Sequence, residues 1–297
     1  MRFDLGTDED EFFGGDANEV INGDAGDDYI RGGGGNDTIT GGAGADDMDG
    51  GDDSDLYILS GNQATGDLIS DSGSTGTDTV RITGNLTAAT GLALDLSISG
   101  VESLDLFGAN RSITGSNSAS LADSIDLSGI DNIISSTGVG PFTLTINGQA
   151  GDDTISGTDG GEVIIGGAGS DNLTGNDGAD VFRYTSRNEL NSSWTDIITD
   201  FVQGSDVLSF RSGTSSTQFG NALAELDANT GTLDSVHFAS LAADGATTSV
   251  GADVRFIFDE STNTLYYDPS GGTSTGRLLV AELKNGVTLT ASDIKLY

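Results

Sequence analysis

The sequence contains no cysteine, two prolines and one histidine among its 297 residues. Without cysteine there are no disulfides, which secreted proteins commonly use as covalent staples. Basic residues are also scarce, because 11 Lys and Arg stand against 47 Asp and Glu, giving a formal net charge of -36. Binding to nucleic acid or to an anionic membrane surface needs basic patches, so this balance argues against both classes of partner.

Long apolar runs are missing as well. No segment approaches the roughly 20 apolar residues that a membrane-spanning helix needs. The first ten residues, MRFDLGTDED, lack the basic and apolar regions of a cleavable export signal. We therefore expect no transmembrane segment and no signal of the Sec type.

Residues that carry catalytic chemistry are equally scarce. The single His237 cannot assemble a multi-histidine metal site, and the H-E-x-x-H motif of zinc proteases is absent. Residues 272–276, GTSTG, match the nucleophile motif G-x-S-x-G, but that motif needs a strand before it and a helix after it, and these flanks read as a hairpin. Trp194 and Tyr184 are interpreted as core or capping residues rather than as a sugar platform. We expect no catalytic residue.

Glycine, by contrast, is abundant and recurs at a fixed phase. Residues 32–49 are two consecutive copies of the nine-residue pattern G-G-x-G-x-D-x-U-x, in which U is a large apolar residue. Ten windows share this register, in a first block within residues 5–58 and a second within 148–183. Their sixth positions are Asp10, Glu19, Asp28, Asp37, Asp46, Asp55, Asp153, Glu162, Asp171 and Asp180. Their eighth positions are Phe12, Ile21, Ile30, Ile39, Met48, Tyr57, Ile155, Ile164, Leu173 and Phe182.

The alternation within the pattern predicts its local structure. The x-U-x triplet is a short strand whose U side chain points inward, because successive strand residues face opposite sides. The glycine-rich part is a tight turn that needs positive φ angles and close backbone approach. Nine residues then form half a coil, and eighteen form a full coil of a parallel β-roll. The glycines expected to line the ion-binding turns are Gly32, Gly33, Gly35, Gly41, Gly42, Gly44, Gly166, Gly167 and Gly169.

Stacked coils also stack the sixth-position acids, and alternate repeats share an edge of the roll. Carboxylates about 4.8 Å apart repel by roughly 3–4 kcal/mol at an effective dielectric constant near 20. A hard dication with about six to eight oxygen ligands removes this repulsion. Magnesium prefers a small octahedron and zinc prefers Cys and His, so acids and turn carbonyls together predict several bound Ca²⁺ ions.

Both blocks resemble the RTX, or haemolysin-type calcium-binding, repeats of bacterial secreted proteins, whose nine-residue pattern they share. Residues 196–210, DIITDFVQGSDVLSF, resemble the sequence that follows the β-roll in serralysin-type proteases and in the repeat modules of alginate epimerases. Residues 256–297 are similar to the C-terminal domain of RTX proteins. The resemblance implies an uncleaved C-terminal signal that is read by the type I secretion machinery. It also implies that Asp200, with Asp196 and Asp206, holds a further ion.

The predicted fold class is all-β, with a parallel β-roll or β-solenoid in two calcium-binding blocks. We expect a first roll at 1–58, a β-solenoid-like or β-sandwich middle segment at 59–147, a second roll at 148–183, and a C-terminal β cap with the secretion signal at 184–297. The middle passes from strand into the second roll without a linker. This favours one continuous, elongated body over separate beads.

The number of ions follows from the stacking. One ion between alternate repeats gives about four ions in the first block and about two in the second. Glu19 and Glu162 are one methylene longer than aspartate, so we expect their sites to be distorted or empty. The blocks are expected to cap differently at Asp55 and Asp180, where partner turns are missing.

Three functions remain open at this point. The first is a non-catalytic secreted calcium-binding protein of the cell surface, an S-layer or a matrix, or an adhesin, with polysaccharide or other matrix components as partners. Its rolls stay unfolded at low calcium inside the cell and fold outside it. The second is the secretion and folding module of a larger RTX enzyme of the protease, epimerase or lipase type, since the chain starts almost directly in a repeat. The third is a small membrane-acting effector, against which the lack of an amphipathic or apolar segment counts.

Overall fold

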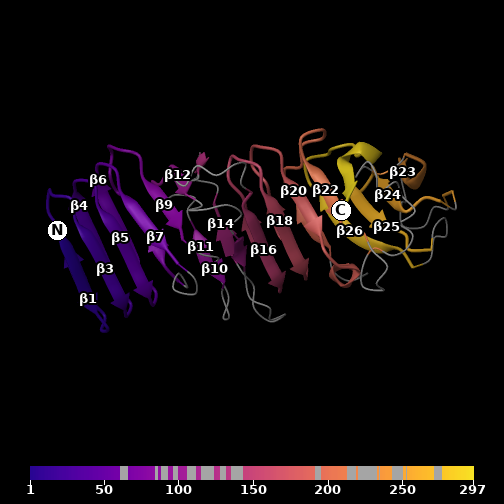
Figure 1. The fold of residues 1–297 in the computed structure, drawn as a ribbon. Coiled ribbons are helices and arrows are strands. Elements are labelled where there is room, and N and C mark those ends of the chain that lie inside the picture. Colours follow the sequence, from indigo (N-terminus) through magenta and orange to yellow (C-terminus); the bar gives the residue numbers. More distant parts are fainter. Residues whose placement is uncertain are drawn as a thin grey trace.

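The structure is a computed structural model that describes residues 1–60, 66–83, 86–87, 93–95, 100–105, 112–114, 124–127, 132–134, 143–190, 195–212, 219, 233, 235–242, 250–251, 253–270 and 276–297. The chain forms an elongated stack of strands (Figure 1). The described helical elements are the short 3₁₀ turns η2 (Arg187–Glu189), η3 (Ser235–His237) and η4 (Ala291–Asp293). In this part of the chain no helix has the length and apolarity needed to cross a membrane.

Two parallel sheets form the first coils. One sheet contains β1 (Arg2–Gly6), β3 (Val20–Ala25), β5 (Thr38–Ala43) and β7 (Leu56–Leu59). The other contains β2 (Glu11–Phe13), β4 (Tyr29–Gly34), β6 (Asp47–Asp52) and β8 (Leu68–Ile69). Ile21 lies opposite Ile39, and Ile30 lies opposite Met48, so neighbouring strands are eighteen residues apart. The predicted parallel β-roll of two nine-residue half-coils is confirmed.

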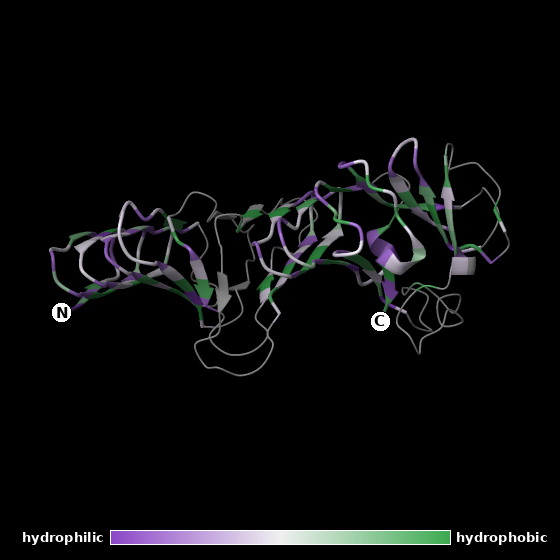
Figure 2. Ribbon diagram, turned by 90° about the horizontal axis from the view of Figure 1, so that it is seen from above, coloured by the Kyte–Doolittle hydropathy of each residue, from purple (hydrophilic) through white to green (hydrophobic). Residues whose placement is uncertain are grey.

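The eighth-position side chains fill the space between the two sheets. Ile21, Ile39 and Tyr57 from one sheet, and Ile30 and Met48 from the other, are at most 1% exposed. Burying a side chain of this size stabilises a fold by about 1.5–3 kcal/mol. Figure 2 shows the resulting pattern of hydrophobic strands and more hydrophilic turns along the stack. The apolar phase of the repeat therefore builds one continuous core.

The sheets continue into the middle segment. β7 pairs in parallel with β9 (Thr79–Ile82), β9 with β12 (Ser103–Asp105), and β12 with β15 (Asn132–Ile134). Tyr57 lies opposite Val80, and Val80 opposite Leu104, so the coil lengthens to 23 and then 24 residues. These described strands are arranged as a solenoid that runs across the expected boundary at residues 58 and 59.

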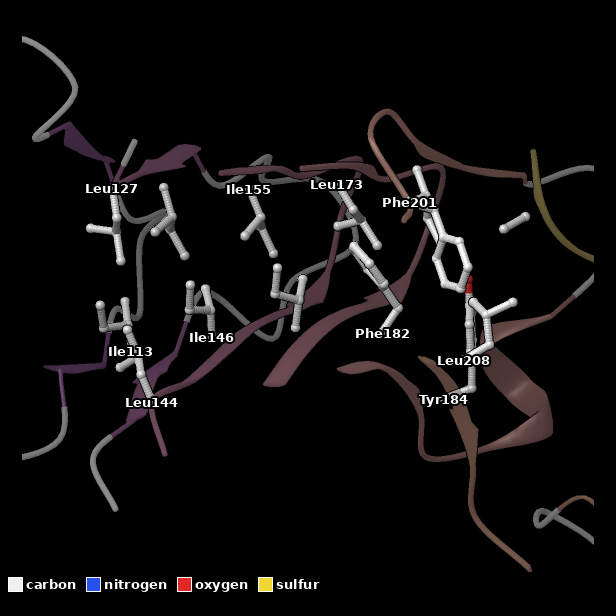
Figure 3. Close-up of a cluster of buried hydrophobic side chains, with 14 of the residues drawn as sticks. Ile113, Leu127, Leu144, Ile146, Ile155, Leu173, Phe182, Tyr184, Phe201 and Leu208 are labelled. Atoms are coloured by element: carbon white, nitrogen blue, oxygen red, sulfur yellow. The ribbon is translucent and has the colours of Figure 1, made fainter. Parts of the chain in front are cut away.

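Two further sheets begin in the middle and carry the second roll. One runs through β10 (Leu86–Thr87), β13 (Ser112–Thr114), β16 (Thr145–Ala150), β18 (Val163–Ala168), β20 (Val181–Tyr184), β22 (Val207–Phe210) and β27 (Ile294–Leu296). The other begins with β11 (Ala93–Asp95), β14 (Ser124–Asp126), β17 (Thr154–Ser156), β19 (Asn172–Thr174) and β21 (Asp196–Ile198). Ile146 and Ile155 face each other from the two sheets, as do Leu173 and Phe182 (Figure 3).

The C-terminal segment completes these sheets. β26 (Leu278–Leu283) pairs in parallel with β21, and β27 pairs in parallel with β22. β26 also begins an antiparallel extension through β25 (Thr264–Tyr267) and β24 (Phe256–Asp259), and β23 (Phe238–Leu241) adds to β24 in parallel. The last strands of the chain therefore close the end of the second roll.

Aromatic side chains form the core of this closure. Tyr184 stacks on Phe210 with ring centroids 5.1 Å apart, and Phe210 also contacts Phe219 and Phe256. Tyr184 is 4% exposed, which agrees with its interpretation as a core residue. Trp194 and most of the GTSTG segment lie outside the described residues.

Candidate metal centre

The glycine positions of the repeat reflect how closely consecutive turns stack. Gly42 and Gly44 have φ angles of 118° and 146°, a region that L side chains rarely adopt. A Cβ on Gly44 would lie 2.0 Å from the carbonyl oxygen of Gly26 in the preceding coil. Any side chain there would separate the coils. Positive φ angles recur at the predicted Gly33, Gly35, Gly167 and Gly169. The first-position residues Gly32, Gly41 and Gly166 instead face the carboxylate of their own repeat.

The sixth-position carboxylates stack in two columns, one on each edge of the roll. The Oδ1 atom of Asp37 accepts a hydrogen bond from the amide of Glu19 at 2.8 Å, and that of Asp55 accepts one from the amide of Asp37 at 2.7 Å. On the other edge, Asp46 Oδ1 accepts from the amide of Asp28 at 2.9 Å. Alternate repeats share an edge, as the sequence predicts. The Oδ1 atoms of three further carboxylates each accept a hydrogen bond from the amide eighteen residues earlier. These carboxylates are Asp28, Asp171 and Asp180.

The second oxygen of these carboxylates is buried without a donor. Within the described residues no hydrogen-bond partner reaches Glu19 Oε2 or the Oδ2 atoms of Asp28, Asp37, Asp46, Asp55, Asp171 and Asp180. These side chains are at most 7% exposed. A buried, ionised oxygen without a partner costs several kcal/mol. A row of them therefore requires a positively charged ligand.

Turn carbonyls point to the same places as these oxygens. A Cβ on Gly23 would lie 2.2 Å from Asp28 Oδ2 and 2.3 Å from the carbonyl oxygen of Gly41. The same pairing of carboxylate and carbonyl recurs at Gly32. Each of these spaces is bordered by acceptor oxygens from two consecutive coils. Hard oxygen donors without nitrogen or sulfur fit Ca²⁺.

Burial in the columns raises the pKa of the carboxyl groups. Loss of hydration is the main cause, and it raises the pKa of Asp37 to about 6, of Asp55 to about 7 and of Asp180 to about 8. The preceding carboxylate of the column adds to this effect, since Glu19 raises the pKa of Asp37 and Asp37 raises that of Asp55. At a pH between the ordinary aspartate pKa and these raised values, the metal-free folded columns therefore bind protons that the unfolded chain has released.

Comparison with protein families agrees with this geometry. The model of the RTX calcium-binding nonapeptide repeat matches residues 4–30, 13–48, 23–57, 145–161 and 156–184. The chain carries RTX calcium-binding repeats within residues 4–57 and 145–184. Its repeats bind Ca²⁺. The sixth-position carboxylates and the turn carbonyls described above would hold the ions. A search of curated proteins finds no match. The matched ranges end at residue 184, so the resemblance of residues 196–210 to serralysin-type proteases and alginate epimerases stays a prediction.

The RTX columns extend beyond the nine-residue blocks. The expectation that partner turns are missing at Asp55 and Asp180 is wrong, because the next coil supplies an acid in both places. The amide of Asp55 donates to Asp78 Oδ1 at 2.7 Å, and the amide of Asp180 donates to Asp206 Oδ1 at 3.0 Å. The same bond joins Asp46 to Asp67, Asp78 to Glu102, and Asp171 to Asp196.

One sequence signal could have found these additional acids. Each lies two residues before an inward apolar residue, as in the D-x-U part of the repeat. The glycines of the pattern are kept only in part, since Asp78 follows Gly73 and Gly76 whereas Asp196 follows no glycine of this kind. The spacing between successive acids also changes, from 18 residues to between 21 and 26. A search for a strict nine-residue phase therefore misses Asp67, Asp78 and Glu102. It also misses Asp196 and Asp206, which only the resemblance of residues 196–210 suggested as ion ligands.

Two predicted ligands have both oxygens engaged by the protein. Glu162 Oε1 accepts from the Thr158 hydroxyl at 2.7 Å and its Oε2 from the Thr158 amide at 3.1 Å. Glu162 therefore departs from the aspartates as expected, whereas Glu19 keeps a buried Oε2 without a donor, as the aspartates do. Asp200 accepts from the amides of Gly175 and Asn176 at 3.0 and 2.7 Å, so it closes a turn.

The remaining predicted acids lie at the starts of the columns. Asp10 is partly exposed in the first coil, and its amide donates to Asp28 Oδ1 at 2.9 Å. Asp153 is 1% exposed, and its amide donates to Asp171 Oδ1 at 3.0 Å. Both residues therefore belong to the columns that the sequence predicts.

The Asp37→Asn variant tests the role of the buried oxygens. Asparagine can still accept the amide bond of Glu19, but its NH₂ group replaces the oxygen that faces the ion. We expect the loss of at least one bound Ca²⁺ in equilibrium dialysis. We also expect a folding midpoint at roughly tenfold higher calcium, equivalent to about 1.4 kcal/mol. The control is Asp8→Asn, which removes an exposed charge outside the columns. Identical behaviour of the two variants would contradict the assignment.

A second prediction concerns pH. Since the folded-state pKa values are raised, the metal-free folded protein binds more protons than the unfolded chain between about pH 4 and about pH 8. Its stability therefore falls as the pH rises through this window. Calcium must displace these protons, so the midpoint of calcium-induced folding should move to higher calcium as the pH is lowered from 8 to 5.5. Circular dichroism titrations of metal-stripped protein measure this midpoint, and a pH-independent value would refute the prediction.

Proposed function

We propose that this protein is a secreted, non-catalytic calcium-binding protein whose rolls fold when they meet extracellular calcium. Its place of action is the cell surface or an extracellular matrix. The observation that carries the proposal is the row of buried carboxylate oxygens without donors, at Asp28, Asp37, Asp46 and Asp55 and again at Asp171 and Asp180. These side chains make the folded state depend on a cation.

The metal-free chain has reasons not to fold at neutral pH. Each coil would bring a new carboxylate to about 4.8 Å from the last one, which costs roughly 3–4 kcal/mol at an effective dielectric constant near 20. Each carboxylate would also lose hydration at one oxygen without gaining a donor. Bound calcium supplies the positive charge that offsets both costs, so the free energy of binding becomes free energy of folding.

This dependence supports export of an unfolded chain. Free calcium inside cells is too low to fill sites tuned to about 10⁻⁴–10⁻³ M, the usual range of extracellular calcium modules. The absence of cysteine removes any need for disulfide formation during export. We assign export to the type I secretion machinery, which reads a C-terminal signal in proteins that the chain resembles. β27 at the C-terminus would then join its sheet only after export.

The non-catalytic role is supported by the chemistry of the described residues. The single His237 is partly exposed, and its Nδ1 lies 2.6 Å from the carbonyl oxygen of Asp253. In the part of the chain that the structure describes, the carboxylates of the columns form regular arrays that are suited to binding ions. An elongated body with a net charge of -36 suits a partner that calcium can bridge, such as acidic surface polysaccharide or other matrix components.

Calcium titration into metal-stripped protein tests the proposal. We expect β-sheet signal in far-UV circular dichroism and a smaller hydrodynamic radius in size exclusion to emerge together and cooperatively with Ca²⁺. Magnesium at the same concentrations should produce neither, because it dehydrates reluctantly and demands a smaller octahedral site. A protein that is already folded in EGTA and does not respond to calcium would refute calcium-driven folding.

A further inference from the structure

Three carboxylates meet where the first roll passes into the middle segment. Asp55, Asp71 and Asp78 each place one carboxylate oxygen so that the three atoms lie within 4.8 Å of one another. Asp55 is the last sixth-position acid of the first block, and Asp78 follows it in the column. Asp71 comes from the stretch after β8 and has no equivalent in the nine-residue pattern. This group therefore differs from the repeat sites, in which one carboxylate faces turn carbonyls.

Asp71 is held in place from inside the core. Tyr57 occupies an eighth position and is fully buried, and its hydroxyl donates to Asp71 Oδ2 at 2.7 Å. The same hydroxyl accepts the amide of Gly50 at the rim of the roll. Asp71 Oδ1 accepts from the amide of Gly73 at 2.9 Å, and each oxygen of this carboxylate keeps a second lone pair that can bind an ion. This contact explains why a tyrosine stands at an eighth position that is aliphatic in most repeats, because its hydroxyl links the apolar core to the third carboxylate.

The group lacks a compensating positive charge. Asp55 is 3% exposed, and its Oδ2 atom has no hydrogen-bond donor. None of the ion pairs among the described residues involves Asp55, Asp71 or Asp78. The nearby Asp49 is already engaged by the Arg31 guanidinium at 3.6 Å and by the Ser72 amide at 2.9 Å. The three carboxylates therefore stay together without a cation from the protein.

The longer coil leaves room for water beside this group. A cavity of about 200 Å³ lies against Asp78, between the turn at 73–76 and the residues Gly100 and Glu102 of the next coil. A water molecule occupies about 30 Å³ in the liquid, so several fit. Calcium takes about six to eight oxygen ligands, more than three carboxylates supply when each binds through one oxygen. Waters in this cavity would complete the set.

We propose that Asp55, Asp71 and Asp78 bind one additional calcium ion, which joins the first roll to the solenoid that follows it. Among the sites of the described residues this one binds calcium most tightly, because calcium affinity rises with the number of charged ligands and with the rigidity of the site. Its three negative charges favour a trivalent lanthanide such as Tb³⁺ even more strongly. The site shares Asp55 with the repeat columns, and Asp71 adds a ligand that the nonapeptide pattern does not contain.

Equilibrium dialysis of the full chain with Ca²⁺ tests the stoichiometry. The Asp71→Asn variant should bind one ion fewer than the wild type, and the highest-affinity phase of the binding curve should be lost. The matched control is Asp8→Asn, which changes an exposed acid far from Asp71 in the sequence. This variant should bind calcium as the wild type does. An Asp71→Asn protein with an unchanged number of ions and unchanged affinities overturns the proposal.

Terbium luminescence provides a second readout that does not depend on Asp71→Asn folding. Excitation of tyrosine should give Tb³⁺ emission with the first equivalent added, since the Tyr57 hydroxyl contacts a ligand of the proposed site. Tyr57→Phe keeps all three carboxylates, so it should retain the ion count but lose most of this early emission. Tyr29→Phe, on the outer face of β4, should not lose it. Equal early emission from Tyr57→Phe and the wild type overturns the proposal.

The outcomes separate this site from the proposed function. A wild-type protein that is folded without calcium, yet loses one ion on Asp71→Asn substitution, refutes calcium-driven folding and supports the site. Calcium-driven folding with no effect of Asp71→Asn or Tyr57→Phe supports the function and refutes the site.

Discussion

The structure depends on carboxylates stacked in columns with one oxygen of each left without a donor. Asp37 and Asp55 show the arrangement most clearly, because one oxygen accepts an amide of the preceding coil and the other is buried and unsatisfied. The amide bond fixes the pitch of the column, while the second oxygen makes the column unstable without a cation. The glycines follow from the same constraint. A side chain at Gly23 or Gly32 would fill the space between carboxylate and carbonyl.

The columns tie the parts of the molecule together. They run from the first roll through Asp78 to Glu102 in the middle segment, and from the second roll to Asp196 and Asp206. The sheets run across the same boundaries, and the C-terminal strands β26 and β27 complete them. We therefore expect ion binding in the blocks to be coupled to ordering of the segments beyond them. Calcium takes the place that disulfides hold in many secreted proteins, which suits a chain without cysteine.

The parts of the fold that could be predicted are those with a strict phase. Glycines and acids nine residues apart predict the roll, the inward residues such as Ile39 and Met48, and the two edges, because strand alternation and stacking leave no other arrangement. The sequence did not predict that the columns continue through Asp67 and Asp78. There the coil length varies, and the glycines of the pattern are kept only in part, as at Gly73 and Gly76 before Asp78.

Other features depend on contacts that a linear pattern does not contain. The resemblance at residues 196–210 suggests Asp200 as an ion ligand, and its hydrogen bonds to the amides of Gly175 and Asn176 are a contact that the sequence pattern does not contain. In the sequence Tyr57 is one more inward apolar residue. Its hydrogen bond to Asp71 forms only when one coil stacks on the next. Thr158 similarly occupies both oxygens of Glu162.

Hydrogen exchange of the column amides, followed by NMR, tests the central claim most directly. The amides of Asp28, Asp37 and Asp171 each donate to the carboxylate of the next coil. The account predicts strong protection of these amides in calcium and exchange close to the unfolded-chain rate in EGTA at neutral pH. Equal protection in calcium and in EGTA would show that the columns are stable without a cation and would contradict the account.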